Sequence, residues 1–247
     1  KNTTTCLKPI DMHLFYHPQI TTNTFTLSEE ESAHAIRVLR LKTGDTVRVT
    51  DGRGTEALCK IVHADTRTCT LHMVQQTLHA KTRPYSLHIA LAPTKNRERI
   101  EWFVEKAVEC GIDEVSFIYT ENSERGKLNV ERLHKISLSA MKQSKQWHLP
   151  VIHELKPYAE FMADEHKGTK LIAWCETEVN GHLLRNCIPP HTTHITLLIG
   201  PEGDFTSKEL TLATEAGFIP VSLGHSILRT ETAALFGCMA VKTLLEN

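Results

Sequence analysis

Two glycine-bearing segments carry the residues most able to do chemistry. The first is Ile199-Gly200-Pro201-Glu202-Gly203-Asp204-Phe205, and the second runs from Leu223 to Ala233 with the sequence LGHSILRTETA. Glycine has no Cβ, so backbone amides and carbonyls in such segments can approach a ligand closely and read an adenine edge. Neither segment is a GxGxxG fingerprint or a phosphate loop with Lys and Ser/Thr. The two segments therefore favour a ligand without phosphate groups.

The candidate cofactor contacts flank these glycines and would act mainly through their backbones. They are Leu198, Ile199, Gly200, Gly203, Leu223, Gly224, Ile227 and Leu228. A purely structural interpretation also exists for each segment. Gly-Pro-Glu-Gly alone is typical of a tight loop, and Thr230, Glu231 and Thr232 would serve as cap residues for a following helix.

The second half of the chain alternates apolar strands with amphipathic helices. The expected strands are 87–92, 115–119, 170–175, 195–199 and 218–223, and the expected helices are 97–110, 130–146, 207–216 and 231–245. This alternation predicts an α/β domain with a parallel sheet covered on both faces. Ligands of open parallel sheets bind beyond the carboxyl ends of the strands. Both glycine segments follow predicted strands and would therefore lie at that edge.

The first half predicts a small antiparallel β domain, a closed or nearly closed barrel. Its expected strands are 13–16, 24–27, 46–50, 57–64 and 68–76. Asp51-Gly52 between two alternating runs is a strong hairpin signal. Ser28 and Glu31 form the pattern of a capping box at a helix start. We expect residues 1–11 to be a disordered leader, 12–82 to be the β domain and 83–247 the α/β domain.

Composition excludes several classes of protein. The net charge is −1 and aromatic residues make up 6% of the chain, which argues against a broad stacking platform for single-stranded nucleic acid. The seven cysteines are scattered without a CxxC pair, as expected of reduced thiols, and no HExxH or Cys/His spacing predicts a metal site. No apolar stretch reaches membrane-spanning length and no signal peptide is present, so we expect a cytoplasmic protein.

Residues 122–148 are locally basic. The segment carries Arg125, Lys127, Arg132, Lys135, Lys142 and Lys145 against Glu124 and Glu131. Such a stripe could contact phosphates, although a solvated helix face is the simpler interpretation.

The two glycine segments resemble the paired signatures of the SPOUT-class RNA methyltransferases, and more narrowly the 16S ribosomal RNA uracil-N3 methyltransferase family. The resemblance extends over nearly the whole chain from Met12. His34-x-x-x-Val38-Leu39-Arg40 is similar to that family's motif in a PUA-like barrel. Further matching segments are Lys95, Arg97, Glu101, Lys106, Glu109 and Gly111, then Asn122–Arg125, and then Ala140–Ser144. Two positions depart from the family pattern: Asp204 replaces a glycine, and Lys145-Gln146 replaces an arginine-containing end.

The resemblance implies a trefoil knot in the C-terminal domain, S-adenosyl-L-methionine bound within it, a homodimer, and methylation of one uridine in small-subunit ribosomal RNA. It also implies an RNA-binding PUA-like barrel. The RNA contacts predicted on this basis are Arg37, Arg40, Arg125, Lys127 and Lys142. A surface ion pair is the alternative role for Arg40.

Uracil N3 bears a proton and is a poor nucleophile until that proton leaves, so the site needs a base or an anion-stabilising cation. We expect Arg229 to stabilise and orient the uridine anion, and Glu202 or Glu231 to accept the proton, with Glu202 preferred because it lies in the glycine loop. Alternatively, Arg229 binds only phosphate and Glu231 only caps the helix. Two other functions stay open: a SPOUT methyltransferase acting on transfer RNA, and a non-catalytic RNA-binding or assembly module. A nucleotide-dependent oxidoreductase is disfavoured by the missing phosphate fingerprint.

Overall fold

The computed structural model describes residues 12–124, 128–175 and 182–246. The chain divides into two compact units: one extends up to Lys81 and includes Met141–His148, and the other comprises Thr82–Ala140 and the chain from Leu149 onward. The inclusion of Met141–His148 in the first unit was not evident from the sequence. It rests on contacts such as the backbone hydrogen bond from Gly54 N to Trp147 O, 2.9 Å.

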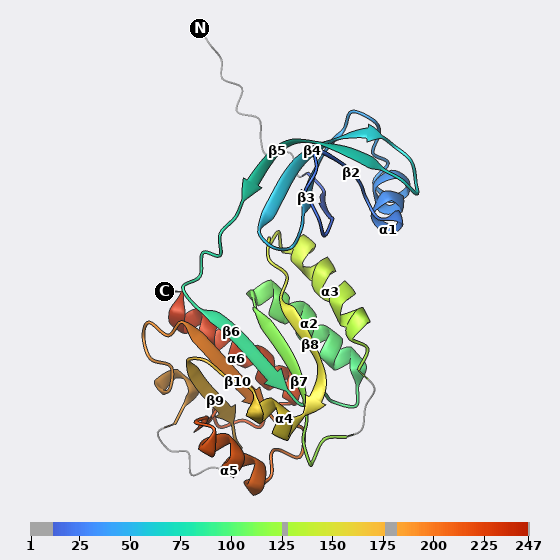
Figure 1. Cartoon of the computed structure of the whole chain (residues 1–247). Coiled ribbons are helices and arrows are strands. Elements are labelled where there is room, and N and C mark those ends of the chain that lie inside the picture. Colours follow the sequence, from blue (N-terminus) through green and yellow to red (C-terminus); the bar gives the residue numbers. More distant parts are fainter. Residues whose placement is uncertain (1–11, 125–127, 176–181, 247) are drawn as a thin grey trace. The chain divides into compact units, whose positions relative to one another are not determined.

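The N-terminal unit is built around a five-stranded sheet in the order β1-β3-β4-β5-β2 (Figure 1). The strands are β1 (Leu14–Tyr16), β2 (Thr24–Thr26), β3 (Thr46–Thr50), β4 (Thr55–His63) and β5 (Thr70–Leu78). The predicted hairpin at Asp51-Gly52 joins β3 to β4. The pairing is not wholly antiparallel, because β1 lies parallel to β3.

The short helix α1 (Glu29–Ala33) continues into a π-helical turn, His34–Val38. Ser28 caps α1 as predicted, since its hydroxyl accepts a hydrogen bond from Glu31 N. The reciprocal hydrogen bond of the capping box, from the Ser28 backbone to the Glu31 side chain, is not seen. The Glu31 carboxylate instead forms an ion pair with the ammonium group of Lys142, at 2.6 Å. Glu31 is buried, so an ion pair with Lys142 satisfies it better than a hydrogen bond to one backbone amide.

The second unit contains a six-stranded sheet in the order β11-β9-β10-β6-β7-β8, and all its pairs are parallel, as predicted. The strands are β6 (Ser86–Leu91), β7 (Glu114–Tyr119), β8 (Val151–Pro157), β9 (Thr169–Ala173), β10 (His194–Ile199) and β11 (Ile219–Val221). Neither β8 nor the helix α4 (Tyr158–Ala163) that follows it was predicted from the sequence. The other strands were predicted from continuous apolar runs. β8 is an edge strand in which His, Glu and Lys residues interrupt such a run.

Helices cover both faces of this sheet (Figure 1). On one face α2 (Arg97–Cys110), α3 (Val130–Gln143) and α6 (Thr230–Leu245) pack over Leu87, Ile89, Phe117 and Leu197. On the other face α4 and α5 (Ser207–Glu215) pack over Ala90, Ile118 and Leu198. Gly111 ends α2 in the left-handed conformation at φ 87°, as predicted for a C-terminal glycine.

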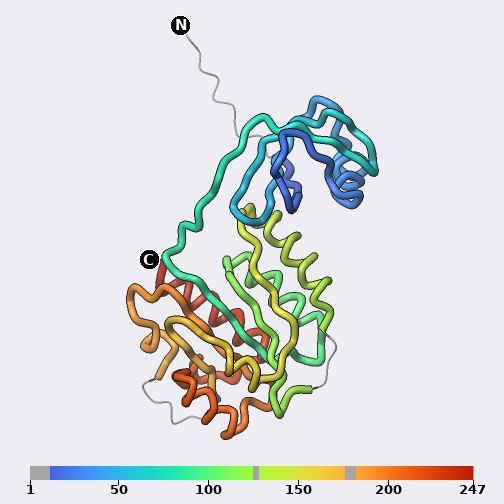
Figure 2. Tube along the Cα trace, viewed as in Figure 1, coloured from blue at the N-terminus to red at the C-terminus, as the bar shows by residue number. Residues whose placement is uncertain are grey.

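The path of the chain brings three strand ends together. After β8 the chain crosses to the other half of the sheet, where β9 and β10 form and β10 inserts between β9 and β6 (Figure 2). The carboxyl ends of β11, β9 and β10 are therefore neighbours at one edge. The trefoil knot stays a prediction. Among the helices of the described ranges, none combines the length and the apolar character needed to span a membrane.

Candidate functional site

A cavity of about 530 Å³ lies at the carboxyl ends of β9, β10 and β11, and both glycine segments line it. Ligand pockets in proteins typically measure about 300–1,000 Å³. The lining residues are Ala173, Trp174, Cys175, Leu183, Ile199, Gly200, Pro201, Asp204, Ser222, Leu223, Gly224, His225, Ser226, Ile227, Leu228, Thr230 and Ala233. The predicted meeting of the two segments at this edge is thus what the structure shows.

The lining is mostly apolar side chains and backbone groups. Within the described part of the chain it includes one carboxylate, that of Asp204, and neither lysine nor arginine. A phosphate-bearing ligand would find no cation among these residues. A ligand with a positive centre and no phosphate suits the lining better, because Asp204 supplies negative charge.

The glycines leave the space that such a ligand needs. A Cβ on Gly200 would meet Asp204 Oδ1 and the Phe205 ring at 3.1 Å, so only glycine fits without displacing them. Gly224 adopts φ +123°, which L side chains rarely take, and no heavy atom lies within 4 Å of the position that its Cβ would occupy. Gly224 is itself one of the residues that line the cavity.

The conformation and contacts of Asp204 explain why an aspartate can stand where the family pattern has a glycine. Its φ is +58°, the left-handed conformation that a glycine would adopt easily and that aspartate tolerates better than most residues. Its Oδ2 accepts a hydrogen bond from Cys175 N at 2.9 Å, and its Oδ1 accepts one from Phe205 N at 2.8 Å. The side chain therefore ties the loop after β10 to the end of β9.

Thr230 ties the second segment to the first. Its hydroxyl donates a hydrogen bond to the carbonyl oxygen of Gly200 at 3.0 Å, and the residue is buried. The expected capping role of Thr230, Glu231 and Thr232 was wrong: the N-cap of α6 is Arg229, which makes no side-chain capping hydrogen bond. Thr230 is the first residue of the helix, and its hydroxyl bonds to the loop after β10 rather than to a backbone amide of α6.

Six of the eight predicted cofactor residues line the cavity: Ile199, Gly200, Leu223, Gly224, Ile227 and Leu228. Leu198 is buried in the sheet beneath it, against α4 and α5. Gly203 lines a different hollow. Ala173, Trp174 and Cys175 also line the cavity but were not predicted to, although they form the carboxyl end of the predicted strand 170–175 and could have been proposed on that ground.

The second hollow measures about 420 Å³ and is strongly charged. Its lining comes from the connections after β6, β7 and β10 and from the first turn of α2: Lys95, Asn96, Arg99, Asn122, Glu124, Glu202 and Gly203. The side-chain amide of Asn122 donates to the carbonyls of Gly203 and Asp204 at 3.1 and 3.0 Å. The glycine loop after β10 therefore borders both hollows: Gly200 and Asp204 line the cavity, and Glu202 and Gly203 line the charged hollow.

The three predicted catalytic residues differ in environment. Arg229 and Glu202 are exposed, whereas the side chain of Glu231 is only 8% exposed. Arg99 Nε lies 3.6 Å from Glu231 Oε1, and Glu231 Oε2 is buried with no hydrogen-bond partner among the described residues. Since Arg99 also lines the charged hollow, Glu231 is in a position to hold that guanidinium.

Comparison with known proteins decides the family. Residues 81–242 match the model of the RNA methyltransferase domain, and residues 27–74 match that of the RNA methyltransferase PUA domain. The chain belongs to the RNA methyltransferase domain family. The first match contains the cavity, the charged hollow and every predicted cofactor residue.

Relatives within this RNA methyltransferase family cover most of the chain. The ribosomal RNA small subunit methyltransferase E of Rickettsia conorii is 29% identical over 88% of this chain and 89% of its own length. A probable rRNA methyltransferase from Porphyromonas gingivalis shares 43% identity and a TM-score of 0.88, over 95% of this chain and 99% of that one. The Neisseria gonorrhoeae ribosomal RNA small subunit methyltransferase E, solved with S-adenosyl methionine bound, shares 26% identity and a TM-score of 0.81, over 94% and 98%.

The predicted RNA contacts fall mainly in the N-terminal unit of this RNA methyltransferase. Arg37 and Arg40 are exposed at the end of the π-helical turn, Arg40 with φ 57°, and neither forms an ion pair with another described residue. Lys142 is largely buried in its ion pair with Glu31, which gives it a structural role. Arg125 and Lys127 lie outside the described residues.

Proposed function

We propose that this chain transfers a methyl group from S-adenosyl-L-methionine to N3 of a uridine in small-subunit (16S) ribosomal RNA. Family membership supports RNA methyl transfer, and the names of the relatives support the ribosomal substrate. The observation that carries the proposal is the cavity formed by the two glycine segments, which offers backbone groups and a carboxylate but no phosphate-binding cation.

The cavity fits the cofactor by size and charge. S-adenosyl-L-methionine supplies a methyl group on a positively charged sulfur, and Asp204 is the complementary charge in the lining. We assign the adenosyl moiety to the backbone of Ile199, Gly200, Leu223 and Gly224, with Ile227 and Leu228 completing the wall. Leu198 supports this wall from within the sheet, and Gly203 shapes the charged hollow.

The charged hollow is the proposed uridine site. Glu202 is exposed there and can accept the N3 proton, so we assign it as the base. Glu231 is better suited to hold Arg99 than to exchange protons with substrate, because it is buried against that arginine. Arg229 stabilises the uridine anion from the start of α6, where the amino end of the helix adds positive potential.

RNA contacts are proposed for Arg37 and Arg40 in the PUA domain and for Arg125 and Lys127 in the methyltransferase domain. The first two present free guanidinium groups within the described residues, as phosphate binding requires. Lys142 would contribute only if its ion pair with Glu31 opened, so we rank it last.

We also propose a homodimer that works in the cytoplasm, where ribosomes are assembled. Helices α2 and α6, which pack together, expose Trp102, Phe236 and Met239 to solvent. Large apolar side chains exposed near one another are typical of a subunit interface. The trefoil knot that the family resemblance implies would place α6 and its amino end firmly at the cofactor cavity.

The test is methyl transfer with labelled cofactor. The purified protein is incubated with small ribosomal subunits and, separately, with transfer RNA, and the product is located by mass mapping. We expect one labelled N3-methyluridine per small subunit and none in transfer RNA. Label in transfer RNA alone would instead support a tRNA methyltransferase, and no label in either RNA would support a non-catalytic binding module.

A further inference from the structure

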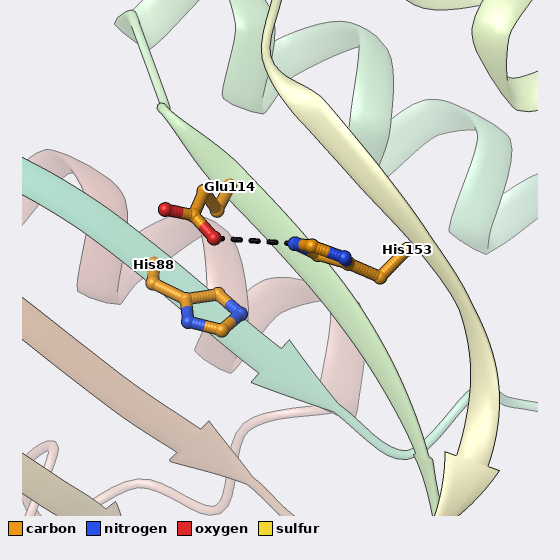
Figure 3. A group of neighbouring side chains, drawn as sticks. All are labelled: His88, Glu114 and His153. Carbon is orange, nitrogen blue, oxygen red and sulfur yellow. Dashed lines mark hydrogen bonds and ion pairs between the residues drawn. The ribbon is translucent and has the colours of Figure 1, made fainter. Parts of the chain in front are cut away.

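Three titratable side chains meet on the sheet of the methyltransferase domain, away from the residues that line the cavity and the charged hollow. His88, Glu114 and His153 come from the neighbouring strands β6, β7 and β8, and Figure 3 shows them pointing toward one another. One ligand atom from each lies within 4.8 Å of the others. Neighbouring members of this group are 26 and 39 residues apart and follow no metal-binding spacing, so the group could not be predicted from motif patterns.

Strand pairing places the three residues together. His88 and Glu114 are direct partners across β6 and β7. Between β7 and β8 the register shifts, so that His153 and Glu154 together oppose Ser116. Such a β-bulge re-aims side chains and is frequent next to functional sites. Here His153 Nε2 lies 3.1 Å from Glu114 Oε2.

The surroundings resemble those of a metal site. Ser116 is buried, and its hydroxyl lies 2.8 Å from His88 Nε2, which fixes the orientation of the ring. Metal-binding histidines usually have such a partner on the ring. The Phe161 ring packs edge-on to His88 with a centroid separation of 5.7 Å and forms an apolar wall. Glu114 and His153 remain 44% and 41% exposed, which leaves a path for an ion.

We propose that His88, Glu114 and His153 form a binding site for one divalent transition-metal ion of the zinc type. Two imidazoles and one carboxylate are a known zinc ligand set, with bonds of about 2.0–2.2 Å and a fourth position for water. Tetrahedral ligands at such bond lengths lie about 3.3 Å apart, so small side-chain rotations close the present arrangement onto an ion. Magnesium and calcium prefer all-oxygen ligands and do not suit this set.

The bound ion would link three adjacent strands on a face distinct from the cofactor cavity. This proposal does not depend on the proposed methyl-transfer activity.

The test uses the full-length, tag-free protein after removal of metals with a chelator. Zinc chloride is titrated by calorimetry, with magnesium chloride as a parallel arm. His153→Gln and Glu114→Gln alter half-exposed residues and should fold, which circular dichroism checks. His63→Gln, an exposed histidine on β4, is the matched control.

We expect one zinc ion per chain, no magnesium binding, and a zinc affinity that falls at least about 100-fold in His153→Gln and Glu114→Gln but is unchanged in His63→Gln. Ser116→Ala should weaken binding by about 10- to 100-fold. Zinc should also raise the melting temperature of the wild-type protein and not that of the two ligand variants. Failure of the wild-type protein to bind zinc, or equal affinity in His153→Gln and Glu114→Gln, would overturn the proposal.

Discussion

Arg229 occupies an unusual position for an arginine. It is the N-cap of α6, yet its side chain makes no capping hydrogen bond and is exposed beside the residues that line the cofactor cavity. Arginine at this position adds little to helix stability compared with Ser, Thr, Asp or Asn. Helix capping therefore gives no reason for an arginine here, whereas the role proposed above, stabilising the uridine anion, does.

Replacing Arg229 by alanine tests this assignment. Turnover at saturating S-adenosyl-L-methionine should fall by about 100-fold or more, because a group that stabilises developing charge is lost. The dissociation constant of the cofactor should stay within about twofold, since the bound cofactor is assigned to backbone groups. Lys208→Ala, an exposed cation on α5, is the control and should keep full turnover. Wild-type turnover in Arg229→Ala would show that the arginine has no part in catalysis.

Gly224 gives a second prediction for a single residue. Gly224→Ala should destabilise the protein by about 1 kcal/mol because of the positive φ, and should weaken cofactor binding about tenfold because the new methyl group enters the cavity. Gly44→Ala is closely matched: Gly44 also has a positive φ, +97°, and open space around it, but it lies in the N-terminal unit. It should lose stability and keep cofactor affinity. Equal affinities of the two variants, measured by calorimetry, would remove Gly224 from the binding site.

At the scale of elements, the start of α6 and the loop after β10 are joined by a hydrogen bond from Thr230. Thr230→Val keeps the shape of the side chain and removes the hydrogen bond to Gly200 O. The free energy of unfolding should fall by about 1–2 kcal/mol, because a partly buried carbonyl loses its partner. Cofactor affinity should fall with it, since the two walls of the cavity are no longer tied together.

Urea unfolding and cofactor titration measure both effects. Thr211→Val is the control, because that hydroxyl bonds only within the exposed surface of α5, to Ser207 O at 2.9 Å. It should change stability by less than about 0.5 kcal/mol. Unchanged stability and affinity in Thr230→Val would mean that the hydrogen bond does not couple the two segments.

Glu56 connects the elements of the N-terminal unit. Burial raises the pKa of Glu56, but hydrogen bonds from Arg48 and His79 outweigh it and hold the pKa below its ordinary value of 4.5. A carboxyl group with a lowered folded-state pKa stabilises the protein above about pH 4.5, and this contribution is lost as the pH falls through the folded-state pKa.

Glu56→Gln should therefore lower unfolding free energy by about 1–2 kcal/mol near pH 7, allowing for the partly exposed Arg48 and His79. The gap between wild type and variant should close as the pH falls below 4.5. Glu30→Gln, an exposed residue on α1, should show no such pH-dependent gap. A constant gap between pH 7 and pH 3, measured by calorimetric unfolding, would contradict the assignment.

The sequence predicted those elements whose periodicity is strong. Helix 97–110 with Gly111 behind it, and the apolar strand 195–199, closely match α2 and β10. β8 was missed because a half-exposed edge strand with charged residues carries a weak apolar pattern. That the two glycine segments meet was predicted from the sequence, but Trp174 and Cys175 were not placed in the cavity lining, since their position there depends on β9 pairing beside β10.

The same limit explains the rest of the site. Nothing in the spacing of Arg99 and Glu231 indicates that α2 and α6 bring them together, and the burial of Glu231 is a tertiary property. The three residues of the proposed metal site meet only through strand register and a β-bulge. Contacts between elements far apart in sequence follow from topology and strand register, which motif spacing and hydrophobic periodicity alone do not reveal.

At the scale of the whole molecule, the chain combines a region that matches a PUA domain with one that matches a methyltransferase domain. The first has the exposed Arg37 and Arg40, for which we propose RNA contacts, and the second has an apolar cavity next to a charged hollow at the carboxyl edge of its sheet.

The most direct measurement is a calorimetric titration of the full chain with S-adenosyl-L-methionine, with NAD and ATP as comparison ligands. We predict one bound S-adenosyl-L-methionine per chain, competition by S-adenosylhomocysteine, and no heat with NAD or ATP, because the cavity lining has no cation for their phosphates. A silent titration with S-adenosyl-L-methionine, or binding of ATP or NAD with equal affinity, would contradict the account.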